Sequence, residues 1–393
     1  MTERSLRGKV AVVGIGETDY YKHGKSPYPE FKMALMAILA AAEDAGINPK
    51  EIDSFASFAD ERSDPSRLAA ALGTPELRFS NLQWGGGGGG GAGAIGNGAA
   101  AIIAGLADVV VVYRSLAQGQ FRRFGQAANG STISGDMALS APYGVISPAQ
   151  RFAMKVMRYM HNHGVGRDAL KAIAQASYHH AQSNPRAVMR GVELTDERYE
   201  TSRWIAEPFK LYDCCMENDG AAALILMSEE RARDMKQKPV YLLSQAQGSE
   251  HRTAARSHNM PNYASANFGP VAKHLWNMAK LGPQDMDVVQ SYENFTGGVL
   301  MALAEHGFFK PEEANDFLTL DNLIVGKGKM PLNTSGGNLA HCYMHGLELQ
   351  IEAVRQLRGT ADSQVEGAKT AAVIAGPMVS PVTSLVFGSE ETL

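Results

Sequence analysis

The chain has 393 residues, of which 45% are hydrophobic and 20% are charged, and its formal net charge is −4 at pH 7. These values are ordinary for a globular protein with a full-sized core, and they indicate no general attraction to nucleic acid or to an anionic membrane. No apolar stretch approaches the roughly 20 residues of a membrane span, and the first residues form no secretory signal. We therefore expect a cytoplasmic protein with no membrane span and no nucleic-acid partner.

The cysteines and histidines do not form an obvious metal or disulfide pattern. The three cysteines, Cys214, Cys215 and Cys342, suit neither a disulfide framework nor a CxxC metal site. Histidines at positions 161, 163, 179 and 180 lack carboxylate or cysteine neighbours that would complete a ligand set. We expect these four histidines on solvated helix faces, and we expect no metal.

The chain begins with a strand–helix–strand pattern. The apolar run KVAVVGIG, Lys9–Gly16, predicts a buried strand that ends in a glycine turn. A dinucleotide-binding GxGxxG fingerprint fails there because Asp19 stands at its third glycine. An apolar helical face from Phe31 to Ala42 follows and stops at Gly46, and the segment NPKEID then leads to a strand at 54–58.

The same order recurs in the second half of the chain. Residues 271–281 have a helical pattern that stops at Gly282, and the segment GPQDMD then leads to a strand at 288–291. This match to the first half indicates that a helix–turn–strand unit has been duplicated.

A second repeated unit starts from a glycine segment in each half. Asn81 precedes a glycine run, a helix, Gly105 and a strand at 108–113. Asn333 likewise precedes a glycine pair, a helix through Leu357, a further glycine and a strand at 370–375. The two repeats together predict a duplicated α/β domain.

A long insertion separates the repeats, and it contains helical patterns at 150–162 and 168–182. A segment of this length with its own helices usually covers a site. We divide the chain into an N-terminal half of residues 1–114 and 204–245, an insertion of residues 115–203, and a C-terminal half of residues 246–393.

Four motifs in order along the chain resemble those of the thiolase superfamily, in its sterol-carrier-thiolase and lipid-transfer-protein branch. The motifs are NDGAAA at 218–223, YENF at 292–295, NTSGGNLA at 333–340 and the helix at 346–358. The resemblance implies an α/β, thiolase-like fold. In that fold two duplicated βαβαβ halves form a layered α-β-α-β-α core with a large helical loop insertion.

The reactive residues of thiolases are replaced at every matching position. Their nucleophilic cysteine falls near Gly88, within the glycine run from Gly85 to Gly91, and their second cysteine falls near Gly376. The histidine of their GHP motif matches Tyr343, and the asparagine of their NEAF motif matches Tyr292. Since ping-pong acyl transfer needs a thiolate, thiolase activity itself is not expected.

The replacements favour proton-transfer chemistry on a thioester enolate. N–H groups at the glycine-rich start of a helix, about Gly88 to Ala92, would stabilise the enolate oxygen. Two facing tyrosines can act as acid, base and hydrogen-bond donor. Because a phenol has a pKa of about 10, a tyrosinate base needs a nearby positive charge. We look for that charge at His341, at His345 or at an arginine of the insertion.

Family members with tyrosines at both positions include aldolases that cleave steroid side chains. The resemblance therefore implies a lyase that cleaves a β-hydroxyacyl-CoA with a bulky, steroid-like acyl group into a ketone or aldehyde and a shorter acyl-CoA. It implies catalytic roles for Tyr292, Tyr343, His341 and His345. Substrate and oxyanion contacts are implied for Gly88, Gly89, Asn294, Gly336, Gly337 and Gly376. The coenzyme A thioester is the substrate, and no covalently bound cofactor is expected.

Two other functions stay open at this point. One is a thiolase-type acyltransferase, for which Cys342 is the local candidate nucleophile, and the other is a non-catalytic acyl-CoA or lipid-binding protein. The resemblance further implies a homodimer. It also implies a small partner that combines a zinc ribbon with an OB-fold, forms a heterotetramer with the chain and completes the CoA site.

Overall fold

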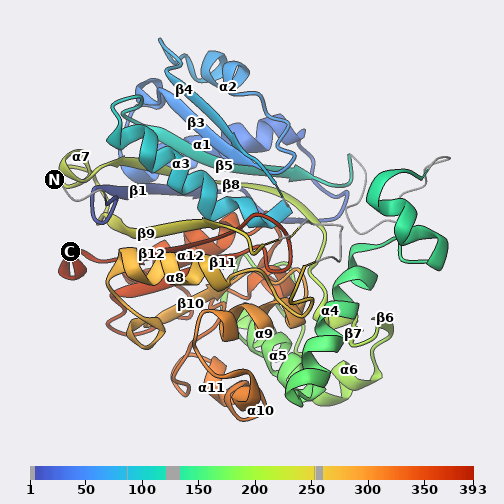
Figure 1. Cartoon of the computed structure of the whole chain (residues 1–393). Coiled ribbons are helices and arrows are strands. Elements are labelled where there is room, and N and C mark those ends of the chain that lie inside the picture. Colours follow the sequence, from blue (N-terminus) through green and yellow to red (C-terminus); the bar gives the residue numbers. More distant parts are fainter. Residues whose placement is uncertain (1–4, 86, 121–132, 252, 254–259) are drawn as a thin grey trace.

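The computed structural model describes residues 5–85, 87–120, 133–251, 253 and 260–393 (Figure 1). The strands are β1 Val10–Glu17, β2 Tyr21–Lys22, β3 Ser54–Phe58, β4 Phe79–Gln83, β5 Val110–Ala117, β6 Trp204–Ala206, β7 Phe209–Lys210, β8 Asn218–Ser228, β9 Val240–Gly248, β10 Val288–Ser291, β11 Thr370–Ala375 and β12 Val382–Gly388. The α-helices are α1 Glu30–Ala45, α2 Pro65–Leu72, α3 Gly91–Ile103, α4 Pro148–His163, α5 Arg167–Ser183, α6 Asp196–Thr201, α7 Glu229–Ala232, α8 Gly269–Ala279, α9 Thr296–Glu305, α10 Ala314–Phe317, α11 Leu320–Leu323 and α12 Leu347–Arg358.

The strand order shows the duplication directly. The main sheet runs β10-β11-β12-β9-β1-β8-β5-β3-β4, with β2 paired to β8. In the first half, β8 is antiparallel to β1 and to β5, and β5 is parallel to β3. In the second half, β12 is antiparallel to β9 and to β11, and β11 is parallel to β10. The two halves are joined by a short antiparallel pairing of Ala11 with Tyr241 and Val12 with Val240.

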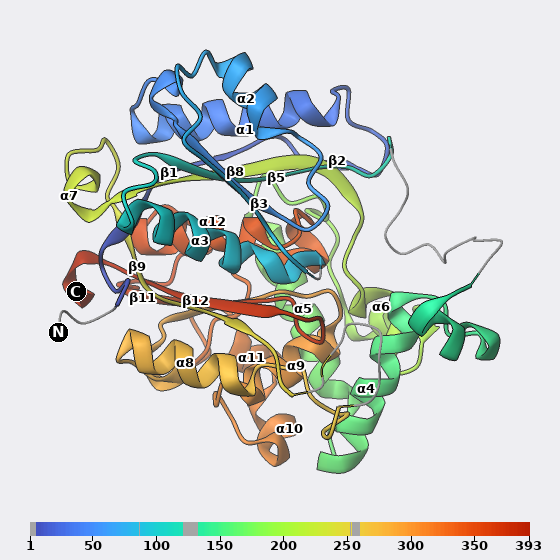
Figure 2. The ribbon, with the colours of Figure 1, turned by 45° about the horizontal axis from the view of Figure 1, so that its top comes forward.

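The two half-sheets enclose a central helical layer. Figures 1 and 2 show α3 and α12 between them, α1 and α2 on the outer face of the first, and α8 and α9 on the outer face of the second. Small residues let α3 approach the second half-sheet, because a Cβ atom on Gly96 would come within 3.0 Å of Gln245. The predicted layered α-β-α-β-α core is therefore confirmed.

Most of the predicted repeat elements have the expected positions. The strands at 54–58 and 288–291 coincide with β3 and β10, and α1 ends at Gly46, whose φ of 76° is left-handed. The helix predicted to reach residue 281 ends at Ala279, because Lys280 adopts a left-handed φ of 56°. Asn81, which precedes the glycine run, lies inside β4.

The described part of the insertion contains the two expected helices. Helix α4 begins at a capping box between Ser147 and Gln150, with Pro148 at its first position, and α5 follows after Gly164. Helix α4 packs on α9 so closely that a Cβ atom on Gly297 would overlap Val156. The part of the predicted insertion at residues 121–132 lies outside the described residues.

One expectation for the histidines was wrong. His180 is 1% exposed, its Nε2 atom accepts a hydrogen bond from the Val325 N–H at 3.1 Å, and burial lowers its pKa to about 4. His161 and His179 are exposed, and His163 contacts Glu312. The helices of the described residues all lack the combination of length and hydropathy that a membrane crossing requires.

Candidate active site

Two tyrosines that are far apart in sequence share one hydrogen bond. Tyr292 follows β10, and Tyr343 lies between a π-helical turn, Gly337–His341, and α12. Their Oη atoms are 2.7 Å apart, and the side chains are 3% and 7% exposed. The Tyr292 N–H donates to the Ile374 carbonyl at 2.8 Å, and the Tyr343 N–H donates to Oδ1 of Asn218 at 2.6 Å. Both halves of the fold therefore position the pair.

Gly88 lies directly against the ring of Tyr292. A Cβ atom added to Gly88 would lie 2.1 Å from Cζ and 2.4 Å from Oη of Tyr292, and one on Gly346 would lie 2.8 Å from Cδ2. The tyrosine ring therefore occupies the space that a side chain at position 88 would need. A cysteine at 88 and a tyrosine at 292 exclude one another in this arrangement.

The second glycine that replaces a thiolase cysteine is also closely packed. Gly376 has a left-handed φ of 75°, and a Cβ atom on it would lie less than 3.0 Å from Cα of Gly89. The hydroxyl of Thr383 donates to the Gly89 carbonyl at 2.5 Å. These contacts hold Gly88 and Gly89 in the 3-10 turn that leads into α3, at the positive end of the helix dipole.

The residues next to the tyrosines mainly bind protein groups. Nδ2 of Asn294 donates to the Pro377 carbonyl at 3.3 Å, and its Oδ1 accepts from the Phe295 N–H at 2.8 Å. Glu293 accepts hydrogen bonds from the Ser177 hydroxyl and the Asn338 N–H, and burial raises its pKa to about 7.

The glycine pair 336–337 shapes the turn that carries Tyr343. Both residues have left-handed φ values, 107° and 54°, and added Cβ atoms would overlap Ala181 and Glu293 respectively. Their packing partners are thus α5 and a buried carboxylate. A contact of either glycine with the substrate stays a prediction.

The two candidate histidines lie in different surroundings. The ring of His345 meets Tyr343 edge-on, with centroids 5.1 Å apart. His341 contacts the Ser335 hydroxyl at 3.1 Å and the ring of Tyr20 instead. Burial lowers the pKa of His341 to about 3 and the pKa of His345 well below its ordinary value. Neither histidine supplies the expected positive charge.

That charge comes from Arg114 in β5. Its side chain is 0% exposed and forms ion pairs with Glu61 at 3.1 Å and Asp60 at 2.5 Å. The residue lies just before the predicted insertion, and our sequence reasoning missed it. A signal existed, since an arginine inside the apolar run VVVVYRSLA must have a buried partner.

The tyrosine pair is neutral at rest. Burial raises the pKa values of Tyr292 and Tyr343 well above their ordinary value. The hydrogen bond from Tyr343 and the charge of Arg114 both act in the opposite direction on Tyr292 and lower its pKa. Both effects favour negative charge on Tyr292, but burial outweighs them.

The cysteines are poor nucleophiles in this structure. Cys215, which sequence reasoning did not single out, lies at the site, where its thiol is hydrogen-bonded with Tyr343, and burial raises its pKa to about 12. Cys342 is fully buried near Tyr20 and Glu348, and burial raises its pKa well above the ordinary value. Burial also raises the pKa of Cys214.

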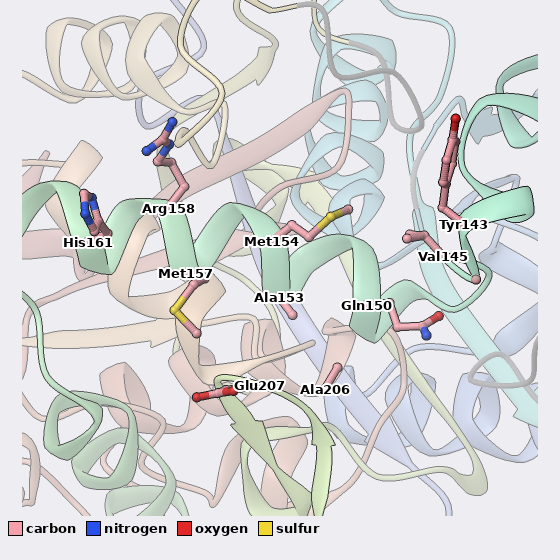
Figure 3. A pocket seen from close by; sticks show the side chains of 11 residues that line it. Tyr143, Val145, Gln150, Ala153, Met154, Met157, Arg158, His161, Ala206 and Glu207 are labelled. Carbon is pink, nitrogen blue, oxygen red and sulfur yellow. The ribbon is translucent and has the colours of Figure 1, made fainter.

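A separate pocket lies on the insertion (Figure 3). It has a volume of about 580 Å³ and is lined by α4, the preceding loop and the β6–β7 turn. Its apolar lining includes Met154 and Met157, and Arg158, His161 and Glu207 surround it. The tyrosine pair is not part of this lining. The opposite face of α4 packs toward the YENF motif, where Phe152 contacts Phe295.

Comparisons with known proteins agree with the geometry of the site. Residues 246–389 match the family model described as "Thiolase C-terminal domain-like". The chain is 38% identical to a 17-hydroxy-3-oxo-4-pregnene-20-carboxyl-CoA lyase of Mycobacterium tuberculosis, with 98% of this chain and 100% of the relative covered. It is 36% identical to a steroid side-chain-cleaving aldolase of Thermomonospora curvata, with 98% and 99% covered.

The solved structure of an Ltp2-ChsH2(DUF35) aldolase superposes with a TM-score of 0.89 at 35% identity, and the match covers 98% of this chain and 99% of that one. Sequence and structure comparisons therefore point to the same group of proteins. The chain belongs to the thiolase superfamily, in the branch that contains the steroid side-chain-cleaving aldolases.

Proposed function

We propose that the chain is a carbon–carbon lyase that cleaves a β-hydroxyacyl-CoA by retro-aldol chemistry, with Tyr292 and Tyr343 transferring the proton. One observation carries the proposal. The two phenol oxygens are 2.7 Å apart, and the ring of Tyr292 fills the space beside Gly88 where a thiolase would carry its nucleophile. The names of the relatives, a CoA lyase and a side-chain-cleaving aldolase, support the same reaction class.

A relay through two neutral phenols accounts for every proton. The β-hydroxyl proton of the substrate passes to Oη of Tyr292, whose own proton passes to Oη of Tyr343. The Cα–Cβ bond breaks, its electron pair forms the thioester enolate, and the β-carbon becomes the carbonyl carbon of the released ketone or aldehyde. Tyr343 gives its own proton to the α-carbon as it accepts the proton of Tyr292, so neither phenol carries two protons at any point and both end neutral. We assign Tyr292 to the substrate hydroxyl because the hydrogen bond from Tyr343 and the charge of Arg114 favour negative charge on its oxygen, against the larger effect of burial.

The developing enolate needs hydrogen-bond donors at the thioester oxygen. We assign this role to the N–H groups of Gly88 and Gly89, because the 3-10 turn at Gly87–Gly90 leads into α3 next to Tyr292. Asn294 and Gly376 are proposed to shape the adjacent wall. No covalent adduct forms in this series of reaction steps, so the reaction does not require the buried cysteines.

The three cysteines, all among the described residues, are poor candidates for the nucleophile of an acyltransferase. Burial raises the pKa values of all three cysteines, and the candidate Cys342 lies beside Tyr20 and Glu348. Acyl transfer needs a thiolate, which these surroundings disfavour. The lipid-binding alternative leaves the hydrogen-bonded tyrosine pair without a role.

The names of the relatives also support a substrate class and a partner. We propose a bulky, steroid-like acyl group on the CoA thioester. We further propose a small zinc-ribbon and OB-fold partner in a heterotetramer, a proposal supported by the similar Ltp2-ChsH2(DUF35) aldolase, whose name includes a DUF35 protein. A homodimer through the edge strand β4 is supported by Leu82 and Trp84, which are 54% and 86% exposed. We also propose that the chain is divided into an N-terminal half of residues 1–114 and 204–245, an insertion of residues 115–203 and a C-terminal half of residues 246–393. A cytoplasmic location is proposed as well.

The direct test is a panel of β-hydroxyacyl-CoA thioesters, with branched and steroid-like acyl groups, assayed with and without the small zinc-ribbon protein. Release of a ketone or aldehyde with a shortened acyl-CoA is the expected result. Tight binding of every thioester without any cleavage, in both conditions, would instead support the lipid-binding alternative. Full turnover by the chain alone would remove the need for the partner and leave the lyase assignment intact.

A further inference from the structure

The guanidinium of Arg114 is hydrogen-bonded to one ring nitrogen of His345. Its Nε atom donates to Nδ1 of His345 at 3.1 Å, and its NH2 group lies 2.9 Å from the same nitrogen. A guanidinium has only donors, so Nδ1 of His345 accepts the hydrogen bond. The single proton of the neutral ring must therefore reside on Nε2. The hydrogen bond from Arg114 therefore sets the tautomer of His345.

The other groups around His345 also disfavour its protonation. Burial is the largest effect, and the charges of Arg114 and Arg62 add to it. The nearby carboxylates of Asp60 and Glu61 form ion pairs with Arg114. Glu61 also accepts hydrogen bonds from the N–H and the hydroxyl of Ser115. The Tyr343 ring also contacts the ring of His345. Glu348, in the first turn of α12, accepts a hydrogen bond from the N–H of the neighbouring Met344 at 3.2 Å, and burial raises its pKa to about 8. No carboxylate of this set is placed to stabilise an imidazolium.

The backbone of His345 gives an independent indication that its position matters. Its φ of 51° lies in the left-handed region, which non-glycine residues rarely adopt, and the next residue, Gly346, has a φ of 88°. Such a conformation persists only where surrounding contacts hold it, and it is concentrated at functional sites. The contacts of His345 here include the Arg114 guanidinium and the Tyr343 ring.

We propose that Arg114 is a positioning residue for the lyase reaction: by donating to Nδ1, it keeps His345 a neutral imidazole with its proton on Nε2. His345 then acts beside Tyr343 as a hydrogen-bond donor to the reacting oxygen and does not act as a general acid or base. The catalytic part of this inference depends on the proposed function, whereas the tautomer and charge of His345 do not.

Histidine-labelled protein allows the tautomer to be read by ¹H–¹⁵N NMR, with His345→Gln to assign the resonance. The expected result is a proton on Nε2 that persists from about pH 8 to about pH 5.5, a range that spans the ordinary imidazole pKa of ~6.5. A proton on Nδ1, or a ring that titrates within this range, would overturn the inference. This measurement needs no active enzyme, so it remains decisive if the lyase assignment fails.

Arg114→Met tests the coupling, and Arg114→Lys provides a variant that keeps a charge against Glu61 if the first one fails to fold. In either variant His345 should lose its fixed tautomer. The value of kcat should fall about 10- to 100-fold, as expected for loss of a charge-assisted hydrogen bond. The remaining activity of Arg114→Met should gain an acid limb near pH 6.5.

Arg78→Gln is the matched control. It removes an arginine that forms ion pairs with Asp53 and Asp108, just before β3 and β5. This substitution should change neither the His345 signal nor kcat. An unchanged kcat in His345→Gln, in enzyme that does cleave its substrate, would contradict the catalytic role while leaving the lyase assignment in place. A loss of kcat in Arg114→Lys with an unchanged His345 tautomer would contradict the positioning role.

Discussion

A Cβ atom on Gly88 would lie less than 3.0 Å from the phenol oxygen of Tyr292, so the two positions compete for one volume. This competition explains why the loss of the thiolase cysteine and the gain of the tyrosine belong together. A cysteine at 88 would displace the ring that forms the 2.7 Å hydrogen bond with Tyr343. The exchange therefore replaces a covalent nucleophile with a proton-transferring pair.

Restoring the cysteine alone should damage the protein. Gly88→Cys is expected to lower the free energy of unfolding by roughly 1–3 kcal/mol, the usual cost of overpacking a core, and to abolish cleavage. The double variant Gly88→Cys with Tyr292→Asn removes the overlapping ring and should recover most of the lost stability. Chemical denaturation of the single and double variants measures this coupling, and strictly additive effects would refute the competition.

Removing either phenol oxygen should affect catalysis far more than stability. Tyr292→Phe and Tyr343→Phe are each expected to lower kcat by roughly 10²- to 10⁴-fold, because each interrupts the proton relay. Each should cost only about 1 kcal/mol of folding free energy, the usual net value of one hydrogen bond. The double variant should be no slower than the worse single variant, since the two groups act as a unit. Multiplicative losses in kcat would argue against a relay.

The buried cysteines should be dispensable for turnover. Cys342→Ser and Cys215→Ala should each retain kcat within about tenfold of the wild type, because burial keeps both thiols protonated. Mass spectrometry of enzyme quenched during turnover should show no acylated cysteine. An acyl adduct on Cys342 that disappears in Cys342→Ser would favour the acyltransferase alternative.

Glu348 should make stability depend on pH. Burial raises its folded pKa to about 8 from an unfolded value near 4.5. Protonated Glu348 therefore stabilises the fold fully below the unfolded pKa, and this contribution is lost as the pH rises from about 4.5 through 8.

The matched variant Glu348→Gln cannot ionise, so it should lose less stability than the wild type over this range, by on the order of a few kcal/mol. Equilibrium unfolding at several pH values measures the difference. Parallel stability curves for the two proteins would show that Glu348 is not protonated in the folded state.

The repeat was predictable because its signals are local. Glycine stops such as Gly46 and Gly359 adopt the left-handed caps that the sequence pattern requires, and the strand at 288–291 follows its turn as expected. Strands β9 and β12 gave no comparable signal. Their identity depends on pairing with each other across more than a hundred residues of chain, which no local pattern reports.

The site was predictable only in part. The resemblance identified Tyr292 and Tyr343, but it could not tell the surroundings of His345 from those of His341, which lies four positions earlier. The π-helical turn that ends at His341 directs that ring toward Tyr20, and the left-handed residue His345 directs the next one toward Arg114. Arg114 and Cys215 reach the site through tertiary pairing of β5 and of the segment before β8, so sequence spacing could not place them there.

The most direct test of the central claim is a single-turnover experiment with one β-hydroxyacyl-CoA and excess enzyme, with the small zinc-ribbon protein present. Products and enzyme mass are followed together by mass spectrometry. The account predicts one equivalent of ketone or aldehyde and one of shortened acyl-CoA, with no change in the mass of the enzyme, and loss of both products in Tyr343→Phe. Acylated enzyme formed from the shortened product, or undiminished cleavage in Tyr343→Phe, would contradict it.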